Sequence, residues 1–508
     1  MSGSAAGRDQ EIEIKFRTDA AGLARLLDAP LLNTANDLHT ENLKATYFDT
    51  PSNALRKKGV ILRIRKSGEA VPVLGMKAPG AAGDGPFHRR EVEVNSPSLK
   101  PNLALFDKTT EKFLTRIIGG QPLAAKFKME FKRQSGLVTS GSSVVEIAVD
   151  QGHISCGKLR VPLAEVELEL VSGTKSDLLD LAKRLAEEFS LRLDFVSKAE
   201  KGFRALLEER PAPVKAAPIK SKSLATIDDA VTAIISNTLA HFIANWACLR
   251  ESEEPESIHQ MRVALRRMRC GLSIFNRAFP NTGFGALRDD AGRLASAFGS
   301  VRNADAIRIS VVEGPLASGD CPESSDALRG IMEKRRIAAY VSAHSEIGSL
   351  AATLFVLKVQ SFLVNGSWRE GVKPKMRTRK FFKAELSRLR GRVLKRGKAA
   401  GVSDQARHKL RIALKNLRYG VEFFDLFGKS KRKQAYKKRM SALQDLLGVR
   451  NDIVVAKTYL IELREETGPE GAQILEFIRG WYARDATATD RAISKSLKKF
   501  QRMEPFWI

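Results

Sequence analysis

The hydrophobic pattern of the chain changes near residue 210, at the stretch ERPAPVKAAPIKSKS (residues 209–223). Before this stretch, short segments alternate polar and apolar residues with a period of two, which is typical of strands that bury one face. After it, long stretches rich in Ala, Leu, Arg and Lys follow the spacing of helices. The three prolines in the stretch favour an extended linker. We therefore expect two modules of different fold class, since 508 residues are also too many for one hydrophobic core.

The first module is predicted to be an antiparallel barrel or sandwich, with helices near residues 19–28 and 175–190. The second module is predicted to be all-helical. The fold class is therefore multi-domain α+β, with an all-α module after the β module. The alternating segments of the first module are EIEIKF (11–16), VILRIRK (60–66), HRREVEV (88–94), SVVEIAVD (143–150) and AEVELEL (164–170).

The helical half contains an internal repeat. IHQMRVALRRMRCGLSIF (258–275) matches RHKLRIALKNLRYGVEFF (407–424) at an offset of 149 residues. FGSVRNADAI and LGVRNDIVVA follow these segments and place their arginines 148 residues apart. Two different motifs at nearly the same offset indicate a duplication. We expect two helical bundles, at about residues 224–370 and 375–508.

Positive charge is concentrated after the linker. The formal net charge is +27, and residues 1–210 hold 32 basic and 28 acidic residues against 53 and 30 in residues 211–508. Such asymmetry points to a polyanionic partner for the basic half, which would be nucleic acid, an acidic membrane or another phosphate polymer. The alternative is a solvated basic surface that serves solubility.

The sequence favours a cytoplasmic protein. No apolar run approaches the roughly 18 residues that span a bilayer, and the first residues lack the apolar core of a secretory signal. We therefore expect no membrane partner. The four cysteines have no paired short spacing, which argues against a zinc site or a disulfide framework. These cysteines are Cys156, Cys248, Cys270 and Cys321.

The alternating strands place like side chains on one face, because residues two apart in a strand point the same way. Glu165, Glu167 and Glu169 share such a face. An ordinary amphipathic strand with its charged face in water would show the same pattern. If the aliphatic faces instead pack outward against helices, the charged faces line the interior of a barrel. Rows of Arg and Lys would then suit a phosphate chain, and unpaired carboxylates would suit Mg²⁺ or Mn²⁺.

Four ordered motifs resemble the CYTH family of triphosphate tunnel metalloenzymes over about residues 9–206. They are E-x-E-x-K in EIEIKF, Y-F-D-T with L-R-x-R in YFDTPSNALRKKGVILRIRK (47–66), the acidic strand EVELEL, and SKAEKG (197–202). The resemblance implies an eight-stranded antiparallel tunnel that binds triphosphate-bearing substrates with a divalent metal. The sequence departs from the family pattern at Met129 and Glu130, where a Thr or a basic residue is usual.

The resemblance also implies roles for individual residues, while Glu165 has the right face but no assigned role. The expected activity is Mg²⁺-dependent hydrolysis of inorganic triphosphate, with Mn²⁺ as a second possible metal. Alternatives are class IV adenylate cyclase activity, thiamine triphosphatase activity, or a scaffold with little catalysis. The implied metal ligands are Glu11, Glu13, Asp150, Glu167 and Glu169; the implied triphosphate-binding residues are Lys15, Arg56, Arg63, Arg65, Lys77, Arg89, Arg133 and Lys198; and the implied catalytic residues are Glu13, Lys15, Glu167 and Glu169.

The helical repeats carry basic stripes, because residues three and four apart lie on one face of a helix. A solvated basic face is the alternative to an anion site. The repeated pattern H-x-x-R-x-x-x-R/K-x-x-R, followed by G-x-x-R-N or G-x-R-N, resembles the CHAD family over about residues 224–508, and that family is associated with binding inorganic polyphosphate and with polyphosphate granules. The implied polyphosphate-binding residues are His259, Arg262, Arg266, Arg269, Arg302, His408, Arg411, Lys415, Arg418 and Arg450.

The expected domains are therefore a CYTH domain at 1–206, a linker at 207–223 and a CHAD domain at 224–508. Nucleic acid is the rival ligand of the basic half. Low aromatic content, at 7%, and the lack of an aromatic-basic RNP-like strand or a zinc finger argue against it. The predicted ligands are thus inorganic triphosphate for the first domain and polyphosphate for the second.

Overall fold

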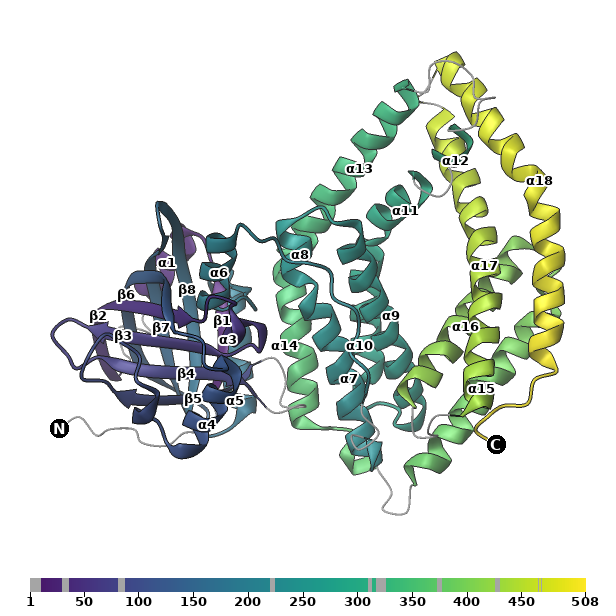
Figure 1. Cartoon of the computed structure of the whole chain (residues 1–508). Coiled ribbons are helices and arrows are strands. Elements are labelled where there is room, and N and C mark those ends of the chain that lie inside the picture. Colours follow the sequence, from purple (N-terminus) through teal and green to yellow (C-terminus); the bar gives the residue numbers. More distant parts are fainter. Residues whose placement is uncertain are drawn as a thin grey trace. The chain divides into compact units, whose positions relative to one another are not determined.

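The computed structural model describes residues 11–29, 36–80, 87–219, 224–308, 313–316, 326–371, 377–424, 430–464, 466 and 468–508. The chain forms two compact units (Figure 1). The first, here called the tunnel unit, consists of Met1–Ala212 with Trp246–Ser252 and Gly348–Asn365. The second, here called the helical unit, consists of Pro213–Asn245, Glu253–Ile347 and Gly366–Ile508. The multi-domain α+β fold class is confirmed, and the two segments that the later sequence adds to the tunnel unit were not predicted.

The tunnel unit is built on one antiparallel sheet that closes on itself. Its strand order is β5-β4-β3-β2-β6-β7-β8-β1-β9, and β1 also pairs with β5, which closes eight strands into a barrel. The free side of β1 is therefore shared by β5 at one end and β9 at the other. The strands are β1 (Glu11–Arg17), β2 (Asn36–Asp49), β3 (Ile61–Ser67), β4 (Val73–Pro79), β5 (His88–Asn95), β6 (Ala124–Ser140), β7 (Ser143–Cys156), β8 (Leu159–Ser172) and β9 (Arg192–Leu193).

Helices cover the aliphatic faces of these strands. Ile14 and Phe16 on β1 are fully buried, as the outward-packing reading predicted. The expected helices near 19–28 and 175–190 are α1 and α5. The tunnel unit contains α1 (Ala20–Leu27), α3 (Ala54–Lys57), η1 (Leu103–Leu105), α4 (Lys108–Ile118), α5 (Lys175–Glu188), α6 (Lys198–Leu207), α8 (Trp246–Glu251) and α14 (Leu350–Asn365).

Helix α6 is held close to the barrel. A Cβ atom on Gly202 would lie only 2.3 Å from the ring of Phe127 on β6, so the helix can approach the strand because this residue has no side chain. Ser197 accepts a hydrogen bond from the backbone of Glu200 and so caps the first turn. The cap and the glycine together fix the start of α6, where Lys198 stands.

The helical unit repeats one arrangement twice. Helices α7 and α9 pack together in the first half, as α15 and α16 do in the second. The halves differ next, because α10 and α11 are separated at Phe298 while their counterpart α17 is continuous. The helices are α7 (Ile227–Ala244), α9 (Pro255–Ala278), α10 (Phe284–Ala297), α11 (Gly299–Ile307), α12 (Glu313–Leu316), α13 (Asp326–Ile347), η4 (Arg369–Gly371), α15 (Thr378–Lys398), α16 (Asp404–Phe423), α17 (Lys431–Arg464) and α18 (Gly468–Gln501).

Three other expectations can be placed on the structure. The expected linker has no helix or strand over residues 209–219, and its residues 220–223 lie outside the described part. Three cysteines are free and buried, whereas Cys321 lies outside the described part; the three are Cys156, Cys248 and Cys270. In the part of the chain that the structure describes, no single helix is long and apolar enough to cross a membrane, and only α13 and α14 taken together as a bent pair reach that length and composition.

Candidate functional site

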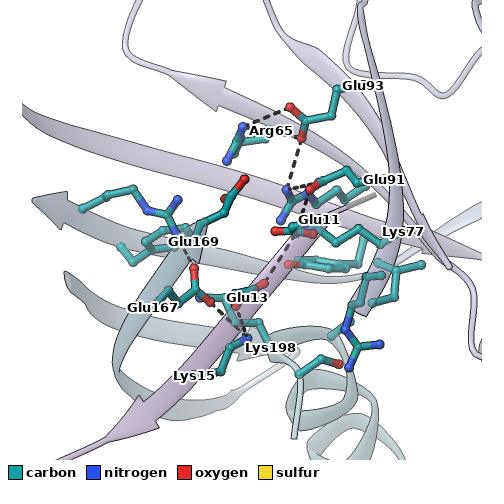
Figure 2. Close-up of a pocket in the computed structure, with 18 of the residues that line it drawn as sticks. Glu11, Glu13, Lys15, Arg65, Lys77, Glu91, Glu93, Glu167, Glu169 and Lys198 are labelled. Atoms are coloured by element: carbon teal, nitrogen blue, oxygen red, sulfur yellow. Dashed lines mark hydrogen bonds and ion pairs between the residues drawn. The ribbon is translucent and has the colours of Figure 1, made fainter. Parts of the chain in front are cut away.

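The interior of the barrel holds a cavity of about 270 Å³ that is lined mostly by charged side chains (Figure 2). All eight strands of the closed barrel contribute to it, and Lys198 enters from the first turn of α6. The charged faces of the strands therefore point inward, as predicted. The charged lining residues are Glu11, Glu13, Lys15, Glu41, Arg63, Arg65, Lys77, Arg89, Glu91, Glu93, Arg133, Glu146, Glu167, Glu169 and Lys198.

Three carboxylates form a row across neighbouring strands on one side of the cavity. Glu13 on β1 lies directly opposite Glu169 on β8, and Glu169 lies opposite Glu146 on β7. Like charges placed directly opposite destabilise a sheet unless a cation relieves them. In the described part of the chain, neither Glu146 nor Glu169 forms an ion pair. Burial, together with the charges of Glu146 and Glu13, raises the pKa of Glu169 to about 7. We call these three residues the carboxylate row.

The carboxylate row fits a divalent cation. Oxygen Oε1 of Glu13 is buried and accepts no hydrogen bond, although the ammonium of Lys15 lies 3.3 Å from it. Hard cations such as Mg²⁺ prefer carboxylate oxygens. The described residues do not include three His, Cys, Asp or Glu side chains already gathered closely enough to form a metal site. The row therefore supplies suitable ligands that must draw together around an ion.

A basic cluster surrounds Glu167 on the neighbouring row of the barrel. Lys15 Nζ lies 3.0 Å from Glu167 Oε1, Arg133 Nη2 lies 2.7 Å from Oε2, and Lys198 also contacts the carboxylate. Burial alone would raise the pKa of Glu167, but Lys198, Lys15 and Arg133 hold it well below its ordinary value. Three cations thus already contact one carboxylate. We call this part of the cavity, around Glu167, Lys15, Arg133 and Lys198, its floor.

Asp150 lies behind this cluster rather than on the cavity wall. Its side chain is fully buried, and Arg133 binds both of its oxygens at 2.7 Å while Lys198 lies 2.8 Å from Oδ2. Both carboxylate oxygens are therefore engaged by cations. The metal-ligand role expected for Asp150 stays a prediction, and the visible role is to position Arg133 and Lys198.

A second basic row lines the cavity along β3 and β4. Arg63 Nη2 lies 3.1 Å from Glu91 and 3.2 Å from Glu93, which also pairs with Arg65 at 3.3 Å. Lys77 lies 2.9 Å from both Glu11 and Glu91. Burial raises the pKa of Glu11 despite the nearby Lys77. These cations point into the cavity with acidic partners that a more highly charged anion could displace (Figure 2).

Arg56 is the other candidate, besides Asp150, that lies outside the cavity lining, and Glu165, which had no assigned role, lies outside it as well. Arg56 instead pairs with Glu200 at 3.0 Å and with Glu209 at 2.8 Å. Glu165 is fully buried beneath the floor and lies 2.9 Å from Lys198. The lining residues not included among the candidates are Glu41, Tyr47, Ile61, Glu91, Glu93, Phe131, Glu146, Ser197 and Ala199. Alternation could have found Glu91 and Glu93, which share the segment HRREVEV with Arg89.

The helical unit holds a separate basic cavity of about 130 Å³ between its two halves. Residues of α9 and α11 from the first half meet residues of α16 and α17 from the second. Burial and the neighbouring Arg266 and Arg411 lower the pKa of Lys415 to about 7. The Nε atoms of Arg262 and Arg411 are buried without a hydrogen-bond partner. The lining is His259, Arg262, Arg266, Arg302, Asn303, Ala306, Arg411, Lys415, Asn451, Asp452 and Val455.

Four candidates of the basic stripes do not line this cavity. His408 Nδ1 lies 3.0 Å from the amide oxygen of Asn451, and Arg418 pairs with Glu422 at 3.0 Å. Arg450 is bound by two carboxylates, and a Cβ atom on Gly292 would lie 3.5 Å from the guanidinium group of Arg269. The two repeats therefore contribute unequally: His259 faces the cavity, whereas its counterpart does not. Asn303 and Asn451, from the repeated R-N motif, were not among the candidates.

Two protein families match the chain in succession. The CYTH domain matches residues 9–203 and the CHAD domain matches residues 233–460. The chain thus contains a CYTH domain followed by a CHAD domain, and both resemblances seen in the sequence are confirmed.

Individual relatives cover parts of the chain. It is 31% identical over 158 residues to the inorganic triphosphatase of Haemophilus influenzae, which covers 31% of this chain and 44% of that protein. It is 26% identical over 289 residues to an uncharacterized protein of Mycobacterium tuberculosis, covering 53% and 52%. The chain therefore spans about half the length of these curated relatives. The crystal structure of the CHAD domain from the plant Ricinus communis is similar at a TM-score of 0.48 and 28% identity, covering 56% of this chain and 96% of that one.

Proposed function

We propose that the tunnel unit hydrolyses inorganic triphosphate to diphosphate and phosphate with Mg²⁺ or Mn²⁺. The observation that carries this proposal is the division of one cavity into basic walls and the carboxylate row. Basic walls match the oxygens of a phosphate chain, and the row matches the cation that such a chain binds. The similarity to the inorganic triphosphatase of Haemophilus influenzae supports the same class of substrate.

The residues of the cavity would have different roles according to their positions. Arg63, Arg65 and Arg89 would hold the phosphate chain along β3 and β5, and Lys15 and Lys198 would bind oxygens near the floor. A divalent cation held by Glu11 and the carboxylate row, with Glu167 beside them, would neutralise phosphate oxygens and acidify a water. In-line attack of a water on the terminal phosphorus would form one P–O bond and break the bond to the bridging oxygen, and the products would carry the released proton.

The cavity favours inorganic triphosphate over a nucleotide or thiamine triphosphate. Its lining includes two aromatic residues, Tyr47 and Phe131, among fifteen charged ones. A purine or thiazole ring would gain little from such walls, because aromatic and apolar side chains supply most of the contact that rings need. The alternatives remain distinct outcomes of one assay.

A phosphate-release panel tests this proposal. Purified protein with Mg²⁺ is given inorganic triphosphate, ATP, thiamine triphosphate and long polyphosphate. We expect the highest kcat/KM for inorganic triphosphate, and loss of that activity in Glu169→Ala and Glu167→Ala. Formation of cyclic AMP from ATP without release from triphosphate would instead establish a cyclase, and release from no substrate would leave a binding scaffold.

We also propose that the helical unit binds inorganic polyphosphate in its basic cavity. The supporting observation is that cations from both halves meet there, two of them with buried Nε atoms that lack a partner. A polymer with about one charge for each phosphate could satisfy several of them at once. Such binding would take the protein to polyphosphate granules in the cytoplasm.

Competition separates polyphosphate from nucleic acid. We expect long-chain polyphosphate to bind in physiological salt, and duplex DNA or RNA not to displace it. The double variant Arg262→Ala with Arg411→Ala should lose this binding and keep triphosphate hydrolysis, whereas Arg418→Ala serves as a matched control because this arginine pairs with Glu422 outside the cavity. Efficient displacement by nucleic acid would overturn the polyphosphate proposal.

A further inference from the structure

A short helix from the later sequence completes the tunnel unit. Helix α8 lies some 40 residues beyond the first module in sequence, yet it belongs to the tunnel unit. Its Arg250 lies 3.3 Å from Asp194, which is the residue that follows β9. Its Trp246 packs edge to face against Phe195, with ring centroids 5.4 Å apart. Two neighbouring residues of one segment are therefore held by one helix.

The segment that α8 holds runs directly beside the active-site strand β1. The backbone N–H of Asp194 donates to the carbonyl of Lys15 at 2.9 Å. Asp194 Oδ1 also accepts from the backbone of Val196 at 3.1 Å, which shapes the turn leading to Lys198. Asp194, which contacts α8, is thus hydrogen-bonded to the backbone of Lys15 and stands four residues before Lys198.

A chain of buried charges follows the same path. Asp194 Oδ2 lies 2.7 Å from Lys201, and Lys201 lies 2.5 Å from Glu165. The other oxygen of Glu165 lies 2.9 Å from Lys198 and 3.7 Å from Lys15. Asp194 and Glu165 have side chains at most 1% exposed, so water screens these charges little. Burial would raise the pKa of Asp194, but Lys201 and Arg250 hold it at about 2.

We propose that Arg250 is a positioning residue of the tunnel site, acting through Asp194, Lys201 and Glu165 on Lys15 and Lys198. This inference rests on the proposed function of that site. With Arg250 present, Asp194 shares its charge between two cations, and Lys201 stays on Glu165. Without Arg250, Lys201 is drawn toward Asp194. Glu165 then pulls Lys15 and Lys198 away from the cavity, where they would meet phosphate oxygens. The helical half of the sequence thereby contributes to the chemistry of the tunnel.

Three variants of the full-length protein test this proposal. Arg250→Ala removes the charge, and Arg250→Lys keeps it. Arg192→Ala is the matched control, because Arg192 stands two residues before Asp194 and donates to the carbonyl of Gly348 at 2.7 Å, on the other added segment. It thus loosens a comparable contact of the tunnel unit without touching the charge chain.

The first readout is kinetic. We expect Arg250→Ala to lower kcat/KM for triphosphate by about tenfold, mainly through KM, as is typical when a group that orients a binding residue is lost. Arg250→Lys should recover most of this loss, and Arg192→Ala should leave both constants near those of the wild type. Equal effects of Arg250→Ala and Arg192→Ala would mean that Arg250 only stabilises the fold, and would overturn the proposal.

The second readout does not depend on turnover. Calorimetric titration with inorganic triphosphate in EDTA measures binding by the cations of the cavity alone. We expect a dissociation constant about tenfold higher for Arg250→Ala than for wild type or Arg192→Ala. If wild type binds triphosphate but does not hydrolyse it, the proposed function fails while this comparison still decides the role of Arg250. Unchanged affinity in Arg250→Ala, or no binding by wild type, contradicts the inference.

Discussion

Replacing Glu169 by Gln should stabilise the metal-free protein at alkaline pH. Glu169 lies between Glu13 and Glu146 in the carboxylate row, and its pKa is about 7 in place of the ordinary 4.5. A carboxyl group with a raised pKa makes the folded state bind more protons than the unfolded state between these values, so stability falls as pH rises through this window. The neutral amide of Gln avoids that loss.

The size of the effect follows from the same values. A pKa of 4.5 in the unfolded protein and about 7 in the folded protein corresponds to a free-energy difference of about 3 kcal/mol, at about 1.4 kcal/mol for each pH unit. Because Glu169 faces a water-accessible cavity, screening reduces this to about 2 kcal/mol. We therefore expect Glu169→Gln to exceed wild type by about 2 kcal/mol at pH 8 and to match it at pH 4.5.

Urea unfolding in EDTA at the two pH values measures this difference. Glu130→Gln is the matched control, because Glu130 also lies on a strand but its side chain is 47% exposed and pairs with Lys44 at 3.9 Å. Mg²⁺ should then stabilise wild type more than Glu169→Gln. If Glu169→Gln is less stable than wild type at pH 8, or shows the same difference at both pH values, the repulsion argued for the carboxylate row is absent.

Three further variants probe other parts of the structure. Asp49→Ala should destabilise the tunnel unit by about 3 kcal/mol in denaturant unfolding, because this fully buried carboxylate accepts three backbone N–H groups that fix α3; a loss below the error of the measurement would refute this. Gly75→Ala should cost about 1 kcal/mol and raise KM for triphosphate, because its Cβ would lie 3.2 Å from Glu93, the partner of the cavity arginines; an unchanged KM would count against it. Polyphosphate affinity should fall by up to about tenfold for each pH unit above 7, because bound phosphate raises the pKa of Lys415 from about 7 and binding takes up a proton; titrations in which Lys415→Met keeps this slope would exclude Lys415 as its source.

The strands that could be predicted are those with strict alternation. Apolar and charged residues alternate regularly in residues 11–16 of β1 and 165–170 of β8, and most of the charged ones line the cavity. In β4, VLGMKAP, the inward position beside Arg63 is Gly75, which leaves room for the Arg63–Glu93 pair and breaks the alternation. A strand that needs a small residue on its cavity face lacks the regular alternation by which a strand is predicted from sequence.

The candidate site was predictable where a residue of a sequence motif also points into the barrel. Lys15, Arg63 and Lys198 follow from motifs and line the cavity as expected. Arg56 follows from the same motif but is drawn to Glu200 on α6, a pairing across 144 residues that local pattern does not reveal. Arg250 depends in the same way on a contact with Asp194, 56 residues away. Such long-range charge pairs are decided by the folded arrangement, not by spacing.

The repeat predicted equal roles for its two halves, and local packing removed that equality. The imidazole of His408 is in hydrogen-bond contact with the side chain of Asn451. His259 instead lines the basic cavity near Arg302, and burial lowers its pKa. Helix α17 is continuous where α10 and α11 are separate, so equivalent residues meet different neighbours. Duplication indicates a shared framework but not a shared surface.

The products formed from inorganic triphosphate test the central claim most directly. Phosphorus NMR in ¹⁸O-enriched water, with wild type and Mg²⁺, follows both the products and the atom that attacks. We predict equal amounts of phosphate and diphosphate, a single solvent oxygen in the pair, dependence on the divalent metal, and loss of turnover in Glu169→Ala. Triphosphate that stays intact with Mg²⁺ or Mn²⁺, or turnover that is unchanged in EDTA, would contradict a metal-dependent triphosphatase in the tunnel.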